Sequence, residues 1–128
     1  MMSTYLVAVV VMPYEYAEQR HKSEFSDVLL RFWYPAGQRH KVSLAMRVAP
    51  LVLAEMERYL QQPFALPKVD LVPAPQFGAG AMENWGLIIF RDRNLLVDPE
   101  TVTDEDEFTA TMTIVHEFAH QVSAGFQM

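Results

Sequence analysis

Two histidines and a glutamate near the end of the 128-residue sequence have the spacing of a metal site with a general base. His116 and His120 are four residues apart, so a helix presents both imidazoles on one face, within about 6 Å of each other. Glu117 is turned by roughly 100° from His116 on that helix. It can therefore take a proton from an activated water without itself being a ligand. The pattern predicts one zinc ion held by His116 and His120, with Glu117 as the catalytic base.

The alternative is two histidines placed on a core helix by coincidence. A lone histidine on such a helix is more often structural than a ligand, but the complete pentapeptide in a helical pattern favours a metal site. Thr113, one turn earlier, is better explained as a surface or packing residue. The sequence has no cysteine, so any metal must be held by histidine and carboxylate.

A second motif, Gly80-Ala81-Met82-Glu83-Asn84, precedes the histidines by about thirty residues. Read together with His116-Glu117-Phe118-Ala119-His120, it resembles the zinc aminopeptidases of the aminopeptidase N family, which are gluzincins. The likeness extends to Trp85-Gly86-Leu87, to Gln121, and upstream to residues 3–8 and 66–71. It therefore covers most of the chain, and the two motifs together are far more specific than either alone.

This resemblance implies the N-terminal part of a thermolysin-like catalytic domain, and an activity that removes N-terminal residues from peptides. Glu83 matches the glutamate that binds the α-ammonium group of the substrate. The backbone around Gly80 and Ala81 would line the peptide like an added strand, Met82 would shape the pocket for its first side chain, and Asn84 completes the substrate-binding motif. Taken alone, Glu83 would more often be an acid in a turn or at a strand edge.

The sequence departs from the family pattern after the second histidine. The resemblance places the third zinc ligand, a glutamate, about eighteen residues beyond His120, near position 139, whereas the sequence given ends at Met128. Glu107 cannot replace it, because nine residues of helix separate it from His116 by about 13 Å. We therefore expect a fragment of a catalytic domain that lacks the third ligand and a downstream catalytic tyrosine. Val122-Ser123-Ala124 also differ from the usual family tail.

Two other functions remain open from the sequence. The chain could be a catalytically inactive peptide-binding or truncated module with no turnover of its own. It could also be a structural α+β domain that carries the motifs by coincidence.

The elements that must position these residues follow from the apolar pattern of a single partial catalytic domain, 1–128. We expect strands at 4–12, 27–34, 69–72 and 86–90, and helices near 43–62 and 104–125. The polar stretch 15–26 is expected to be a surface connection, and Pro50 should kink the first helix or open its main part. The expected fold class is α+β, with a mixed sheet packed against the long helix that carries the histidines.

The last helix has an apolar stripe with alternating steps of four and three residues, which makes it the clearest helix in the sequence. The stripe contains Phe108, Met112, Val115, Ala119, Val122 and Phe126. Ile114 and Phe118 lie outside it, so the helix is apolar on more than one side and should be central to the domain. Asp104 could cap the helix. The acidic residues around it could form a second metal site, but a solvated loop and helix start explains them better. They are Asp98, Glu100, Asp104, Glu105, Asp106 and Glu107.

Composition excludes several classes of partner. The chain is 51% hydrophobic and 20% charged, with a net charge of -6 and no stripe of lysine and arginine, which argues against nucleic acid or an anionic membrane. The longest apolar run, Tyr5–Met12, is too short to span a bilayer and lacks the flanks of a signal peptide. Localisation is therefore unknown, and the parent protein could be cytoplasmic or membrane-anchored. A truncated last helix should expose apolar surface and favour self-association.

Overall fold

The computed structural model describes residues 13–75, 81–82 and 85–126, with the backbone alone at 81–82 and 123–126. These residues form one five-stranded sheet of order β1-β2-β3-β5-β4. Strands β2, β3 and β5 are parallel, and β1 and β4 pair antiparallel at the two edges. The bounds are β1 Glu15–Lys22, β2 Asp27–Tyr34, β3 Lys68–Ala74, β4 Ala81–Met82 and β5 Leu87–Arg91. The strand expected at 4–12 lies outside the described residues.

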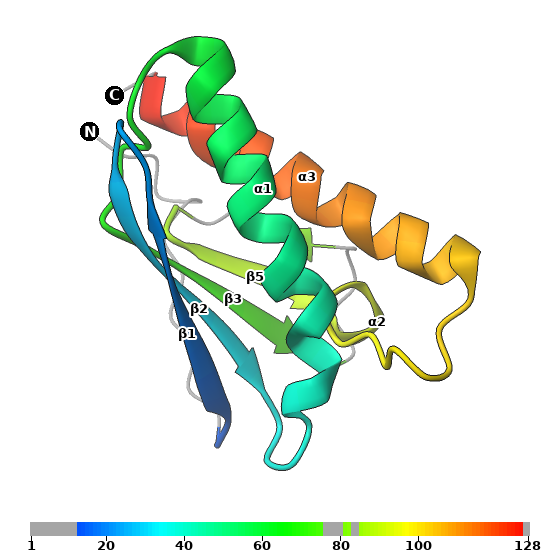
Figure 1. Ribbon diagram of the computed structural model, residues 1–128. Coiled ribbons are helices and arrows are strands. Elements are labelled where there is room, and N and C mark those ends of the chain that lie inside the picture. Colours follow the sequence, from blue (N-terminus) through cyan, green and yellow to red (C-terminus); the bar gives the residue numbers. More distant parts are fainter. Residues whose placement is uncertain (1–12, 76–80, 83–84, 127–128) are drawn as a thin grey trace.

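Two long helices cover the same face of the sheet (Figure 1). Helix α1 (Ser43–Leu60) follows a short 3-10 helix, η2 (Arg39–Val42), and contains Pro50. Helix α3 (Asp104–Phe126) follows the single turn α2 (Asp92–Leu95) and packs beside α1. The expected α+β class, with a mixed sheet packed against the long histidine-bearing helix, is confirmed. In the part of the chain that the structure describes, no helix is both long and apolar enough to cross a membrane.

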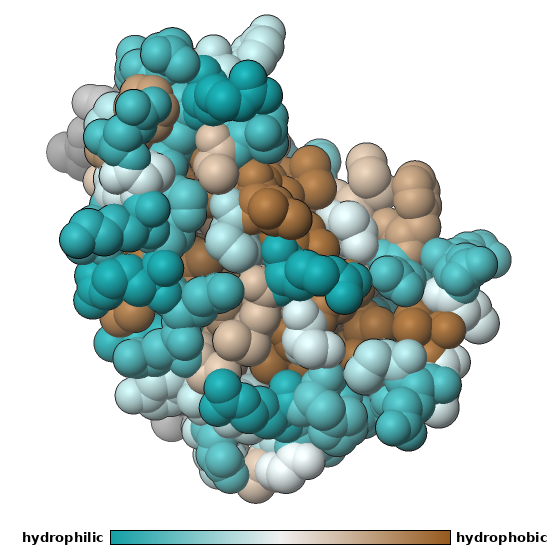
Figure 2. Space-filling view, in the orientation of Figure 1, coloured by the Kyte–Doolittle hydropathy of each residue, from teal (hydrophilic) through white to brown (hydrophobic). Residues whose placement is uncertain are grey.

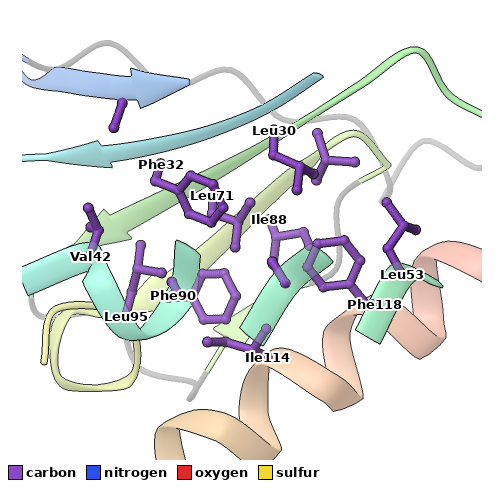
Figure 3. Close-up of a cluster of buried hydrophobic side chains, with 14 of the residues drawn as sticks. Leu30, Phe32, Val42, Leu53, Leu71, Ile88, Phe90, Leu95, Ile114 and Phe118 are labelled. Carbon is purple, nitrogen blue, oxygen red and sulfur yellow. The ribbon is translucent and has the colours of Figure 1, made fainter. Parts of the chain in front are cut away.

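The core lies between the helices and the sheet (Figure 3). Side chains that are less than 2% exposed come from both layers, and they include Leu30, Phe32, Leu71, Ile88 and Phe90 of the strands and Leu53, Ile114 and Phe118 of the helices. Burying each such side chain stabilises the fold by about 1.5–3 kcal/mol. Packing therefore holds α3 firmly over β3 and β5.

The polar segment 15–26 differs from its expectation as a surface connection. Residues 15–22 are strand β1, which pairs along its whole length with β2. Only Ala17 and His21 of this strand are buried. The segment therefore has no alternating apolar pattern from which a strand could be predicted. Its conformation is set by hydrogen bonding to β2, which an edge strand can use in place of a buried face.

A buried carboxylate fastens the β1–β2 hairpin to α1. Glu57 is 3% exposed and accepts hydrogen bonds from His21 Nε2 at 2.8 Å, from Ser23 Oγ at 3.1 Å and from the Phe64 backbone N–H at 3.0 Å. Ser26 Oγ donates a further hydrogen bond to it. Burial would raise the pKa of Glu57, but these hydrogen bonds outweigh it and hold the pKa below its ordinary value. Glu57 therefore links three separate segments as a charged acceptor.

The face of α3 that packs on the sheet lies outside the apolar stripe. Phe108 is 66% exposed and Met112 49% exposed, whereas Ile114 and Phe118 are fully buried. Because the helix is apolar on more than one side, periodicity alone does not decide which side packs on the sheet. Figure 2 shows apolar side chains at the surface over α1 and α3. Self-association through such surface stays a prediction.

The start of α3 also differs from its expectation, because Asp104 is the first helical residue and not the cap. Thr103 takes that place: its Oγ1 accepts a hydrogen bond from the Asp106 N–H at 3.1 Å. Asp104, Glu105 and Asp106 in the first turn are exposed, and the helix dipole favours negative charge there. Among the described residues, no group of three metal-binding side chains occurs, so the alternative of a second metal site here gains no support.

Candidate active site

The two histidines converge on the outward side of α3. Both His116 and His120 are exposed, their ring centroids are 4.5 Å apart, and the rings meet at 77°. The two Nε2 atoms are 2.9 Å apart. Two Nε2 ligands of one tetrahedral zinc ion, each at about 2.0–2.1 Å, would be roughly 3.3 Å apart, so a small ring rotation suffices. The donor set therefore fits a zinc ion held from one helical turn.

Glu117 is placed differently from the histidines although it lies between them in the sequence. Its side chain is 5% exposed and belongs to the part of α3 that faces the rest of the domain. It also lines a shallow depression along the helix, together with Phe108, Met112 and His116. A carboxylate in this position borders both the core and the open side on which the histidines lie.

Two residues of the second motif, Ala81 and Met82, form the edge strand β4 next to this helix. Ala81 pairs with Phe90 and Met82 with Ile89, which makes β4 an antiparallel neighbour of β5. Strand β4 also lies close to α3. Gly80, Glu83 and Asn84 fall outside the described residues, and so do the side chains of Ala81 and Met82. The structure thus brings the backbone at 81–82 to the histidine helix, while the anchoring role of Glu83 stays a prediction.

One contact between the two motifs was missed by the sequence analysis. Gln121, which directly follows His120, is 1% exposed, and its Oε1 accepts a hydrogen bond from the Gly86 N–H at 2.8 Å. A signal for it exists in the sequence, because Ile114, Phe118 and Gln121 follow at steps of four and three residues on one helix face. A polar residue in that series marks a buried group that needs a hydrogen-bonding partner.

Gly86 is held from its other side by β3. Its carbonyl oxygen accepts hydrogen bonds from the Asp70 N–H at 2.9 Å and from Lys68 Nζ at 3.4 Å. Asp70, which is 6% exposed, accepts a hydrogen bond from Trp33 Nε1 at 3.0 Å and pairs with Lys68 Nζ. With φ at +78°, Gly86 occupies a backbone region that favours glycine. The chain is thus tightly fixed just after the second motif.

Comparison with known proteins identifies relatives of the chain. Residues 44–124 match the model of the Peptidase family M1 domain. The chain is 37% identical over 121 residues to Aminopeptidase M1-B of Oryza sativa subsp. japonica. This match covers 94% of the chain and 14% of that protein. It is 37% identical over 125 residues to Aminopeptidase N of Homo sapiens, with 94% of the chain and 12% of that protein covered. The chain thus spans only about an eighth of the length of these curated relatives.

A solved structure is similar in fold as well. A crystal structure of Legionella pneumophila aminopeptidase A in complex with aspartic acid superposes with a TM-score of 0.79 and 25% identity. The match covers 84% of this chain and 13% of that one. The fold likeness therefore extends over most of the chain, as the sequence likeness does.

Proposed function

The chain belongs to peptidase family M1, and on that premise we propose that it forms part of the active site of a zinc aminopeptidase. His116 and His120 would hold the zinc ion, Glu117 would act as the general base, and Glu83 would bind the free amino terminus of a peptide. The observation that carries this proposal is the 2.9 Å approach of the two Nε2 atoms on the open side of α3, where Glu117 and His116 line the same depression.

Each residue would have a distinct part in peptide hydrolysis. Zinc, when bound, supplies a Lewis acid that polarises the peptide carbonyl. Glu117 would take a proton from the attacking water and then deliver a proton to the leaving amine, so that one water is consumed for each peptide bond broken. Glu83 would pair with the α-ammonium of the substrate, and this pairing disfavours an internal residue that has no such charge. The edge strand β4 would present its backbone to the peptide.

We further propose that the third zinc ligand comes from outside these 128 residues. Among the described residues, no third histidine or carboxylate joins the pair to form a three-ligand site. Two imidazoles alone should hold zinc weakly, because protein zinc sites with catalytic function have three protein ligands. The zinc affinity and the turnover therefore depend on that added ligand.

A chimera tests these roles in a complete enzyme. The segment of human Aminopeptidase N that matches this chain would be replaced by the chain, and the product assayed for zinc content and hydrolysis of an amino-acid anilide. We expect about one zinc per molecule and measurable turnover, with kcat reduced by about 10²–10⁴-fold in Glu117→Gln while zinc is retained. Glu105→Gln, an exposed change in the first turn of the same helix, is the matched control and should leave kcat unchanged.

The outcomes separate the alternatives left open by the sequence. A folded chimera that binds zinc and peptide but has no turnover would support the inactive peptide-binding module. If Glu117→Gln retained full kcat, its role as the base would be wrong. Stoichiometric, tight zinc in the isolated 128-residue chain would refute the need for an outside ligand.

A further inference from the structure

Gln121 joins the two motifs of the site through a directional contact, a hydrogen bond to the backbone of Gly86. It lies next to His120 in sequence, and its Oε1 accepts the Gly86 N–H at 2.8 Å across 35 residues of chain. Gly86 follows Asn84, the end of the second motif, by two residues. The contact therefore ties the end of the histidine pentapeptide to the chain that leaves the second motif.

Apolar contacts also hold α3 to the sheet. Ile114 and Phe118 pack against the strands through apolar surface, which holds the helix down but is not directional (Figure 3). Apolar packing alone resists a small shift of the helix along its axis less than a hydrogen bond does, because the hydrogen bond weakens steeply with angle and distance. Gln121 supplies that restraint at the end of the helix where the histidines lie.

Gly86 is suited to receive this restraint because its carbonyl is fixed as well. The Asp70 N–H and Lys68 Nζ hold the carbonyl oxygen to β3, while Gln121 holds the N–H to α3. A shift of α3 would therefore have to break the Gln121 contact before it could move relative to β5. Since β4 pairs with β5, the position of β4 relative to the histidines depends on the same contact.

We propose that Gln121 is a positioning residue that fixes the spacing between the histidine pair on α3 and the edge strand that carries the second motif. This inference deepens the proposed function and rests on it for its catalytic meaning. If Glu83 holds the amino terminus and the histidines hold the metal, the distance between them determines how many residues fit between terminus and scissile bond. Gln121 would therefore act on the choice of substrate through geometry, without touching it.

The first test measures spacing in the 128-residue chain itself and needs no activity. Hydrogen exchange at the Gly86 amide is followed by NMR, and Cu²⁺ bound at the histidine pair broadens nearby amide signals with a steep distance dependence. In Gln121→Met, which removes the amide oxygen while keeping an unbranched side chain, we expect Gly86 to exchange about tenfold faster. We also expect the broadening of the β5 amides to change relative to that of Phe118, with Cu²⁺ affinity unaltered.

Further variants keep this test decisive. Gln121→Glu retains an acceptor oxygen at the same reach and should restore slow exchange at Gly86. Gln121→Asn is shorter by one methylene and should behave like Gln121→Met, so it serves if the methionine variant fails to fold. Gln62→Met, at an exposed glutamine, is the matched control and should change neither measurement. Unchanged exchange and unchanged broadening in Gln121→Met and Gln121→Asn would overturn the proposal.

The second test asks whether the spacing matters to the reaction in the chimeric enzyme. We expect Gln121→Met to lower kcat by about ten- to a hundredfold at unchanged zinc content, and to reduce the preference for free over acetylated amino termini. Gln121→Glu should recover most of both. Altered exchange with unaltered kcat and terminus preference would refute the positioning role. An inactive unmutated chimera would instead refute the proposed function, while exchange and broadening would still decide whether Gln121 sets the spacing.

Discussion

The two faces of helix α3 differ in burial and in the kind of side chain that they carry. The inward face carries Ala110, Ile114, Phe118 and Gln121, all of which are at most 1% exposed. The outward face carries the exposed histidines along with apolar side chains that are open to solvent, Phe108 and Met112. Stability is therefore concentrated on one face, and the proposed metal ligands lie on the other. A rigid inward face is what allows two exposed imidazoles to keep a fixed separation.

Glu117 lies at the boundary of these two faces. It is buried like the inward residues, yet it lines the same depression on the helix surface as His116. If Glu117 is the base, as we propose, this position shields it from bulk water and keeps it next to His116. The division between faces can be tested by changing one residue at a time on each.

The largest effect on stability should come from Phe118→Ala on the inward face. Removing a fully buried phenylalanine leaves a cavity between α3 and the sheet and should cost about 3–5 kcal/mol of unfolding free energy. The same change at Phe108, which is 66% exposed, should cost less than about 0.5 kcal/mol. Denaturant unfolding of both variants measures the difference. Equal losses would show that the outward face is also part of the core.

This contrast also shows what sequence reasoning could and could not supply. The i, i+4 spacing of His116 and His120 is a property of any helix, so their convergence follows from the sequence alone. The buried phase of α3 does not, because apolar residues occur on several sides and only the position of the sheet decides between them. Segment 27–34 is a strand with those same bounds in the structure, and its long apolar run suffices to indicate one.

Other elements depend on partners that are distant in the sequence. Strand β1 is polar and becomes a strand by pairing with β2. The role of Gln121 as a hydrogen-bond acceptor follows only from the position of Gly86, which is 35 residues away in the sequence. In the sequence, Glu57 looks like any other surface acid of a helix. In the structure it is buried because the β1–β2 hairpin packs against it and donates hydrogen bonds to it. Tertiary hydrogen bonds to buried polar groups thus leave little trace in local periodicity.

A second prediction concerns Glu57, whose stabilisation is electrostatic where that of Phe118 is apolar. Its pKa is lowered in the folded chain, so its contribution is present above the unfolded value of about 4.5 and is lost as pH falls through the folded value. Glu57→Gln should cost about 2–3 kcal/mol at neutral pH and should flatten this acid dependence. Urea unfolding at pH 7 and pH 3 measures it. Glu24→Gln, at an exposed glutamate of the β1–β2 hairpin, should change neither value, and an unflattened profile in Glu57→Gln would contradict the assignment.

A smaller effect is expected from Gly86→Ala, which acts where the sheet meets α3. With φ at +78° the alanine is strained by about 1–2 kcal/mol, although its Cβ would meet Leu66 Cδ1 only at an ordinary 3.4 Å. Gly37→Ala is a matched control, because Gly37 has φ at +80° with nothing within 4 Å. Thermal unfolding should show similar losses for both variants. Only Gly86→Ala should also speed amide exchange at residue 86, and a loss of stability without that change would separate Gly86 from the Gln121 contact.

The smallest effect on stability should come from the outward face, at His116. Without metal, His116→Ala should change the unfolding free energy by less than about 0.5 kcal/mol, because the side chain is exposed. In the unmutated chain, zinc at a hundred times its dissociation constant should stabilise the fold by about 2.7 kcal/mol, and His116→Ala should abolish that gain at the same zinc concentration. Thermal unfolding with and without zinc measures both values. His40→Ala, an exposed histidine outside the pair, should keep the full zinc-dependent rise. A zinc effect that survives loss of His116 would place the metal elsewhere, and the outward face of α3 would then have no part in binding it.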